Sequence, residues 1–78
     1  MTSLELVNNL YPAREMTKAV RYRDDYEMRE KISFFFRSGL PIYCYSDSRE
    51  VGGERQGGVV VETQNYDGQV FRQFFGGV

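Results

Sequence analysis

The stretch DDYEMREKISFFFRSGLP, residues 24–41, decides the fold that this sequence predicts. Asp24 and Glu27 are three residues apart, the spacing at which two side chains cap the free backbone amides at the start of a helix. Gly39 is the residue type that most often ends a helix, and Pro41 prevents a helix from continuing. The stretch therefore contains a start signal and a stop signal for one helix.

The side chains inside the stretch agree with this prediction. Glu27 precedes Lys31 by four residues, a spacing at which opposite charges face each other on a helix. The apolar residues recur at helical spacing and would form one buried side; they are Met28, Ile32, Phe35 and Phe36. We predict a helix here and attribute the acidic residues of its first turn to the helix dipole.

Two further helix signals precede this stretch. Thr2 and Glu5 have the spacing of a capping box, which predicts a short first helix with inward-facing Leu4, Leu6, Val7 and Leu10. Pro12 suits the first position of a second helix, because the first helical amide needs no partner. The apolar stripe of that second helix would be Met16, Ala19 and Val20.

The rest of the chain is typical of strands separated by glycine-rich turns. Three strands are predicted: Ile42–Ser46, Gly58–Gln64 and Gln69–Phe75. The segment Asn65-Tyr66-Asp67-Gly68 predicts a type I turn followed by a left-handed glycine. That turn pairs Glu62 with Arg72, Val60 with Phe74 and Gln64 with Val70 on one face, and Val59 with Phe75, Val61 with Gln73 and Thr63 with Phe71 on the other. A two-residue turn would lose the Glu62–Arg72 charge pair, so we favour the longer one.

The first of these strands has two possible registers. If Ile42 and Cys44 share the face of Val61, then Tyr43 and Tyr45 point outward, and a slip of one residue reverses this. We favour outward tyrosines, because cysteine and isoleucine are the more often buried types. The predicted fold is α+β: two or three N-terminal helices packed on one face of a three-stranded antiparallel sheet, within a single domain of residues 1–78.

Two glycine doublets surround a charged patch between the first two predicted strands, from Asp47 to Gly57. A phosphate-binding loop needs a following Gly-Lys-Ser/Thr and a helix, whereas here a strand follows. A calcium loop beginning at Asp47 would place Arg49 and Gly58 where ligands belong, which excludes it. We predict a mobile hairpin loop, and keep as the alternative a loop that orders on a partner through Arg49 and Arg55.

Composition restricts the class of protein. The 78 residues carry ten basic and eleven acidic side chains, a net charge of −1, so the electrostatic footprint of a nucleic-acid binder is absent. The single cysteine suits a reducing compartment. The N-terminal sequence lacks the pattern of a signal peptide, and no apolar run approaches the length of a membrane span. We expect a cytoplasmic protein without membrane contact.

The sequence offers little for catalysis. It contains no histidine and one cysteine, which excludes the usual zinc sites and the nucleophile–histidine pairs of many hydrolases. Cys44 has no evident base, and its place in a strand predicts packing rather than reactivity. We expect a protein that is not an enzyme, with no catalytic residues, no cofactor and no metal.

Two predicted surfaces have the composition of binding sites. Arg14, Lys18 and Arg21 would form a cationic ridge on the second helix, or simply a solvated helix face. The outer face of the sheet would present the side chains of Tyr43, Tyr45, Val60, Val70 and Phe74, with Glu62 and Arg72 among them. Tyrosine and arginine are enriched at interface centres. The alternative is that a helix covers this face.

These surfaces favour a non-enzymatic protein-binding module that binds another protein or its own copy through Tyr43, Tyr45, Val60, Arg72, Phe74 and the ridge. Small chains without catalytic groups include phage and mobile-element accessory proteins that inhibit a host protein or defence complex, and we expect such a role. One alternative is a nucleic-acid-binding regulator, single-strand binding or winged-helix-like, although acidic residues on its third helix would repel phosphate. Another is a self-assembling structural protein.

Overall fold

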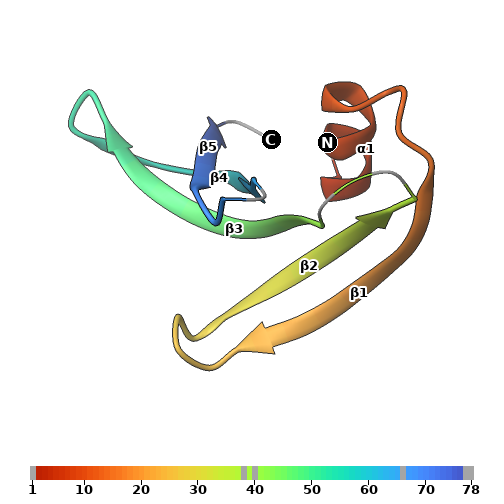
Figure 1. Ribbon diagram of the computed structural model, residues 1–78. Helices are drawn as coiled ribbons and strands as arrows, with labels where there is room; N and C mark the ends of the chain where they lie inside the picture. The colour runs from red at the N-terminus through yellow and green to blue at the C-terminus, as the bar shows by residue number, and fades with distance from the viewer. Residues whose placement is uncertain (1, 38, 40, 66, 77–78) are drawn as a thin grey trace.

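A computed structural model describes residues 2–37, 39, 41–65 and 67–76 of the chain. This part contains one helix and five strands: α1 (Ser3–Leu10), β1 (Met16–Asp24), β2 (Arg29–Phe36), β3 (Ile42–Val51), β4 (Glu54–Gln64) and β5 (Val70–Gly76). Each strand pairs antiparallel with the next along the chain, in the order β1-β2-β3-β4-β5 (Figure 1). The predicted α+β fold with two or three helices on a three-stranded sheet is therefore wrong, because the described chain is mostly β.

The predicted helix of residues 24–39 is instead the hairpin of β1 and β2. The Asp24 carboxylate accepts hydrogen bonds from the backbone amides of Tyr26, at 3.0 Å, and Glu27, at 3.3 Å. An aspartate makes these same bonds when it caps a helix and when it closes a turn. Here the chain reverses after them, Asp24 pairs with Arg29, and Met28 takes a left-handed φ of 53°.

The apolar side chains of β2 alternate between the two faces of the sheet. Ile32, Phe34 and Phe36 face the same side, with Phe34 and Phe36 buried, while Phe35 on the other side is 37% exposed. β2 lies between β1 and β3, and β-branched and aromatic residues pack well in such a central strand. The Glu27–Lys31 ion pair does form, at 2.5 Å, but it joins the turn to a strand rather than two turns of a helix.

The predicted second helix is also wrong, because Met16–Asp24 is strand β1. Its pairing with β2 shifts between Met16 and Lys18, which marks a β-bulge. The extra residue places Met16 and Ala19, three positions apart, on the same face of the sheet. A spacing of three is the helical spacing, so the bulge produced the pattern that predicted a helix.

The first helix is confirmed. The Thr2 hydroxyl accepts a bond from the Glu5 amide at 3.2 Å, and the Glu5 carboxylate accepts one from the Thr2 amide at 3.3 Å. Leu6 and Val7 are buried, whereas Leu4 and Leu10 are 42% and 39% exposed at the sides of the helix. Eight residues form a marginal helix alone, so its packing on the sheet stabilises it.

The predicted hairpin of β4 and β5 is confirmed in its register. All six predicted pairs are present, including Glu62 with Arg72 and Val61 with Gln73. The Asn65 amide donates to the Gln69 carbonyl at 3.0 Å, and Gly68 has a φ of +84°. Tyr66, which is part of the predicted turn, lies outside the described residues.

The predicted loop of residues 47–57 is wrong, because these residues continue β3 and β4. A two-residue turn joins the strands at Gly52 and Gly53, whose φ values of +60° and +83° suit a primed hairpin turn. β2 pairs with β3 only as far as Tyr45, and β5 pairs with β4 only from Gly58. Residues 46–57 therefore form a two-stranded arm that projects from the sheet (Figure 1).

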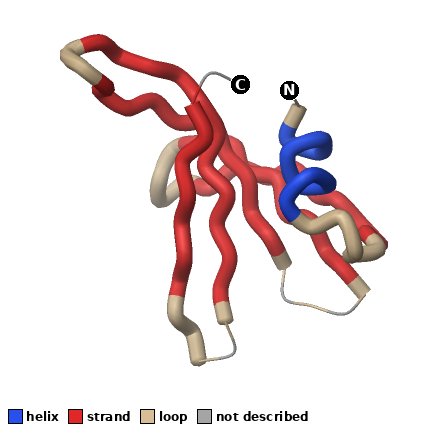
Figure 2. The backbone as a smooth tube through the Cα atoms, turned by 90° about the horizontal axis from the view of Figure 1, so that it is seen from above, coloured by secondary structure: helices blue, strands red, loops and turns tan. Residues whose placement is uncertain are grey.

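The core lies between α1 and one face of the sheet, which we call the helix face (Figure 2). Leu6 and Val7 pack there against five buried side chains of the sheet: Phe34, Phe36, Ile42, Cys44 and Val61. The opposite side, which includes Lys31, Tyr45, Val60 and Glu62, is called the outer face. The described residues span 41 × 27 × 24 Å.

Candidate functional site

The residues of the predicted binding surface do share one face of the sheet, but part of that face is buried. Tyr43, Tyr45, Val60, Arg72 and Phe74 all lie on the outer face, so the favoured register is confirmed. However, Tyr45 is only 6% exposed and Val60 only 1%. The expectation that the side chains of Tyr45 and Val60 are exposed to solvent is therefore wrong.

Cations of the chain itself cover the rings of the outer face. The charged groups of Lys31 and Arg29 lie 4.7 and 5.0 Å from the centre of the Tyr45 ring, and Arg49 lies 4.9 Å from that of Phe74. A cation over an aromatic face is attracted by the ring quadrupole, most strongly where water is excluded. Burial also raises the pKa of Tyr45, whose hydroxyl donates to Glu62 at 3.4 Å.

Among the cations that cover the outer face, Lys31 is itself buried, at 6% exposure. Its ammonium lies 2.5 Å from the Glu27 carboxylate and 3.2 Å from that of Asp24. Burial acts to lower the pKa of Lys31, but hydrogen bonds to Glu27 and Asp24 outweigh it and the pKa is raised above 10.5. The turn of the first hairpin thus closes over the outer face through one buried cation.

The other three members of the predicted outer-face site keep some exposure: Arg72 is exposed, and Tyr43 and Phe74 are half-buried. Arg72 donates to Glu62 at 2.7 Å, a bond that raises the pKa of Arg72 further. Tyr43 is half-buried and packs edge-on against Tyr22, with ring centres 6.5 Å apart. The predicted charge pair is therefore confirmed, and it lies at the side of the outer face that β5 forms.

The predicted cationic ridge does not form. Arg14 precedes β1 and lies over the Tyr11 and Phe36 rings. Lys18 lies over Phe35 on the outer face, whereas Arg21 lines a groove on the helix face. On a strand, residues three apart point to opposite faces, so the three cations cannot share one surface.

The feature that sequence reasoning missed is the free edge of β5. Within the described chain this strand pairs with β4 alone. The Asn65–Gln69 hydrogen bond fixes the alternation of the ladder. It follows that Val70, Arg72, Phe74 and Gly76 direct their backbone amides and carbonyls away from β4, toward the open edge.

The side chains of this edge leave it unprotected. Val70 and Phe71 are 45% and 52% exposed, and β5 has neither a proline nor a register shift. Its one charged residue, Arg72, is already bonded to Glu62. Native sheets usually blunt their edges with charges, prolines or bulges, because a regular apolar edge pairs with other chains.

The opposite edge, β1, has these protections. It contains the bulge at Thr17 and a series of charged residues, namely Lys18, Arg21, Arg23 and Asp24. A strand added there would break at the bulge and would have to accommodate these charges. The contrast between the two edges selects β5 as the side at which another strand can join.

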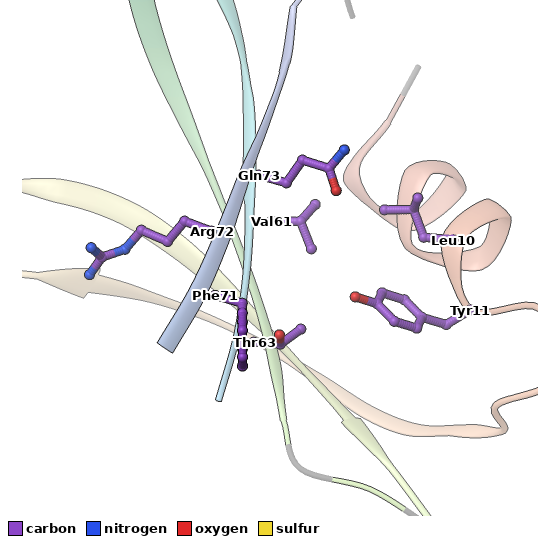
Figure 3. A pocket seen from close by; sticks show the side chains of 7 residues that line it. All are labelled: Leu10, Tyr11, Val61, Thr63, Phe71, Arg72 and Gln73. Carbon is purple, nitrogen blue, oxygen red and sulfur yellow. The ribbon is translucent and has the colours of Figure 1, made fainter. Parts of the chain in front are cut away.

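A groove on the helix face lies beside β5. It has a volume of about 380 Å³ and is lined by Leu10, Tyr11, Val61, Thr63, Phe71, Arg72 and Gln73. Figure 3 shows Leu10 and Tyr11 facing Val61 and Gln73 across the groove, while the Arg72 side chain points to the opposite side of the sheet. We call this the β5 groove, and Phe71 lies at its rim.

A second groove, also of about 380 Å³, lies on the other side of α1 near β1. Leu4, Met16 and Ala19 form part of its apolar lining. This second groove lies beside β1, the protected edge of the sheet. A strand added at that edge could not pair regularly past the bulge at Thr17. The exposed leucines of α1, Leu4 and Leu10, thus belong to different grooves.

The described residues hold no group of three or more metal-ligating side chains placed to bind one ion. Cys44 is buried, and burial raises the pKa of its thiol to about 12, so the nucleophilic thiolate is scarce at neutral pH. No helix in the part of the chain that the structure covers has the length and hydropathy needed to cross a bilayer. The chain matches no protein-family model, no curated protein and no solved structure at a significant level.

Proposed function

We propose that the chain is a non-enzymatic protein-binding module that accepts an extended protein segment as an additional strand beside β5. The observation that carries this proposal is the edge itself: seven residues in regular register, without a free charge, with two exposed apolar side chains. The main chain supplies hydrogen bonds to an added strand, and alternate side chains supply specificity.

The β5 groove gives the added strand a place for its side chains. Those on the helix face would lie next to Phe71, whose ring is half exposed. Covering that half removes roughly 100 Å² from water and contributes about 2.5 kcal/mol before the entropy of association is subtracted. On the outer face the added strand would meet Arg72 and Phe74. The favoured ligand is therefore an extended segment with apolar residues at alternate positions.

Selection from a displayed library of extended peptides tests the proposal. We expect the selected peptides to shift the backbone amide signals of Val70, Arg72 and Phe74 in NMR spectra of the protein. Val70→Lys should weaken binding about tenfold or more, because lysine at an edge opposes strand addition. Val51→Lys is the matched control, since Val51 is a strand valine with 57% exposure in the arm, and it should bind as the wild type does.

Three results would count against a strand-accepting edge at β5. One is a selection that yields no ligand, and another is a set of peptides that bind Val70→Lys unchanged. The third is salt-dependent binding of single-stranded DNA that is lost in Tyr43→Ala, which would favour a nucleic-acid module on the outer face.

A further inference from the structure

A two-fold symmetric pairing of β5 with its own copy has few possible registers. Antiparallel strands bond through residues whose backbone groups face each other, and on β5 these are Val70, Arg72, Phe74 and Gly76. The two-fold axis must therefore pass at Arg72, Gln73 or Phe74 if most of the strand is to pair. These three registers differ in the side chains that they bring together.

The register centred on Gln73 uses the whole strand. It places Val70 opposite Gly76 of the copy, Phe71 opposite Phe75, and Arg72 opposite Phe74, each pair occurring twice. Centring on Arg72 places two arginines opposite each other, which is unfavourable. Centring on Phe74 leaves Val70 and Phe71 beyond the copy's β5. Of the three registers, the one centred on Gln73, the middle residue of β5, is therefore the most favourable.

The contacts of this register suit the exposed groups of β5. On the helix face, the Phe75 ring of the copy would cover Phe71, which is 52% exposed and lies at the rim of the β5 groove. On the outer face, the Arg72 guanidinium, held by Glu62 at 2.7 Å, would lie against the Phe74 ring of the copy. The chain already makes a contact of this kind, since Arg49 lies over its own Phe74 at 4.9 Å.

We propose that the strand accepted by β5 is the β5 of a second copy, paired antiparallel about Gln73, so that two five-stranded sheets form one continuous sheet of ten strands. This inference rests on the proposed function, because it names the partner of the same edge. No described residue pairs with this edge in the monomer, and α1 lies to one side of it, on the helix face (Figure 3). The net charge of −1 per copy opposes association only weakly.

Sedimentation equilibrium of the full chain over a concentration series tests this pairing. We expect a monomer–dimer equilibrium in which Val70→Lys raises the dissociation constant about tenfold or more, while Val51→Lys leaves it unchanged. Circular dichroism spectra of both variants show whether each is folded.

A cysteine placed on the two-fold axis provides a second test, which does not rely on weakening the edge as Val70→Lys does. In this register Gln73→Cys would lie opposite itself, at a position where the two strands do not exchange hydrogen bonds. Cβ atoms approach to about 4.5 Å at such positions, which a disulfide can span, so mild oxidation should yield a covalent dimer. Cys44 is buried and does not compete. Val51→Cys, in the arm, should cross-link only slowly.

The outcomes separate the two proposals. If the chain stays monomeric but binds selected peptides in a Val70-dependent way, the pairing of two copies is overturned and the strand-accepting edge is supported. A dimer that persists in Val70→Lys and is not cross-linked by Gln73→Cys uses another surface, which also overturns the pairing. A monomer that binds no peptide contradicts both.

Discussion

Replacing Lys31 by methionine tests whether the buried cation holds the outer face together. Methionine keeps the length of the lysine stem but removes the ammonium. That group lies 2.5 Å from Glu27, 3.2 Å from Asp24 and 4.7 Å from the centre of the Tyr45 ring. The substitution therefore removes two ion pairs and one cation–π contact at a site that is 6% exposed.

The expected cost is about 2 kcal/mol in the free energy of unfolding. Removing one partner of a fully buried ion pair typically costs about 3–5 kcal/mol. The value here is lower because both carboxylate side chains are about a quarter exposed, although the Glu27 oxygen nearest to Lys31 is itself buried. For a chain of this length, whose total stability is of the order of 4–12 kcal/mol, such a loss lowers the melting temperature by roughly 10 °C.

Urea unfolding followed by far-ultraviolet circular dichroism measures this change, with Lys18→Met as the matched control. Lys18 also lies over a ring, that of Phe35 at 5.7 Å, but it is exposed, so its loss should cost less than about 0.5 kcal/mol. The triple variant Lys31→Met, Asp24→Asn and Glu27→Gln should recover much of the lost stability, because no unpaired charge remains. A Lys31→Met protein as stable as the wild type would refute the argument.

The same variant should change how stability depends on pH. The hydrogen bond from Lys31 is the largest cause that holds the pKa of Asp24 below 3.8. A carboxyl group with a depressed folded pKa stabilises the fold above its unfolded pKa, and that contribution is lost as the pH falls through the folded value. Lys31→Met should therefore show a smaller loss of stability between neutral pH and pH 3 than the wild type.

Three further predictions concern the backbone and the thiol. Gly58→Ala should lower the free energy of unfolding by about 1–3 kcal/mol, because the added Cβ would lie 2.3 Å from the Phe75 carbonyl oxygen. Gly57→Ala should have no such effect, because a Cβ there meets nothing within 4 Å. Equal losses in the two variants, measured by thermal unfolding, would contradict the packing. Met28→Gly should stabilise the fold by up to about 1 kcal/mol by relieving a φ of 53°, and a destabilised variant would contradict this. Cys44 should react with iodoacetamide at neutral pH only when the chain unfolds, and rapid labelling of the native protein would contradict its burial.

The part of the fold that could be predicted from sequence is the part specified by neighbouring residues. The hairpin of β4 and β5 follows from a local turn and from one charge pair, Glu62 with Arg72, that the favoured turn allows and a two-residue turn does not. The capping box of α1 is local too. In both cases the partners are close in sequence, so the pattern contains the whole interaction.

The prediction for residues 24–41 failed because its local signals are shared by two structures. Asp24 accepts the same amide bonds in a helix cap and in this turn, and Glu27 pairs with Lys31 in both. What decides between them is the pairing of β2 with β1 and β3, which a local pattern does not contain. A single bulge at Thr17 hid the alternation of β1 in the same way.

The candidate site could be predicted only in part for the same reason. Tyr45 and Val60 were assigned to the correct face, but the cations that bury Tyr45 come from Arg29 and Lys31, which had been assigned to a helix. The open edge of β5 depends on strand order, and strand order depends on all five strands. A signal was nevertheless present, because the sequence of β5 contains one charged residue, Arg72, whereas that of β1 contains four.

Intermolecular nuclear Overhauser effects in a mixture of isotope-labelled and unlabelled chains test the central claim most directly, since they report which residues of two copies touch. Pairing about Gln73 brings the Hα atoms of Phe71 and of the copy's Phe75 close together, because this pair exchanges no hydrogen bonds. We predict cross-peaks between these two protons and from Gln73 Hα to its own counterpart. Cross-peaks that arise from β1 or the arm, with none from β5, would contradict the account.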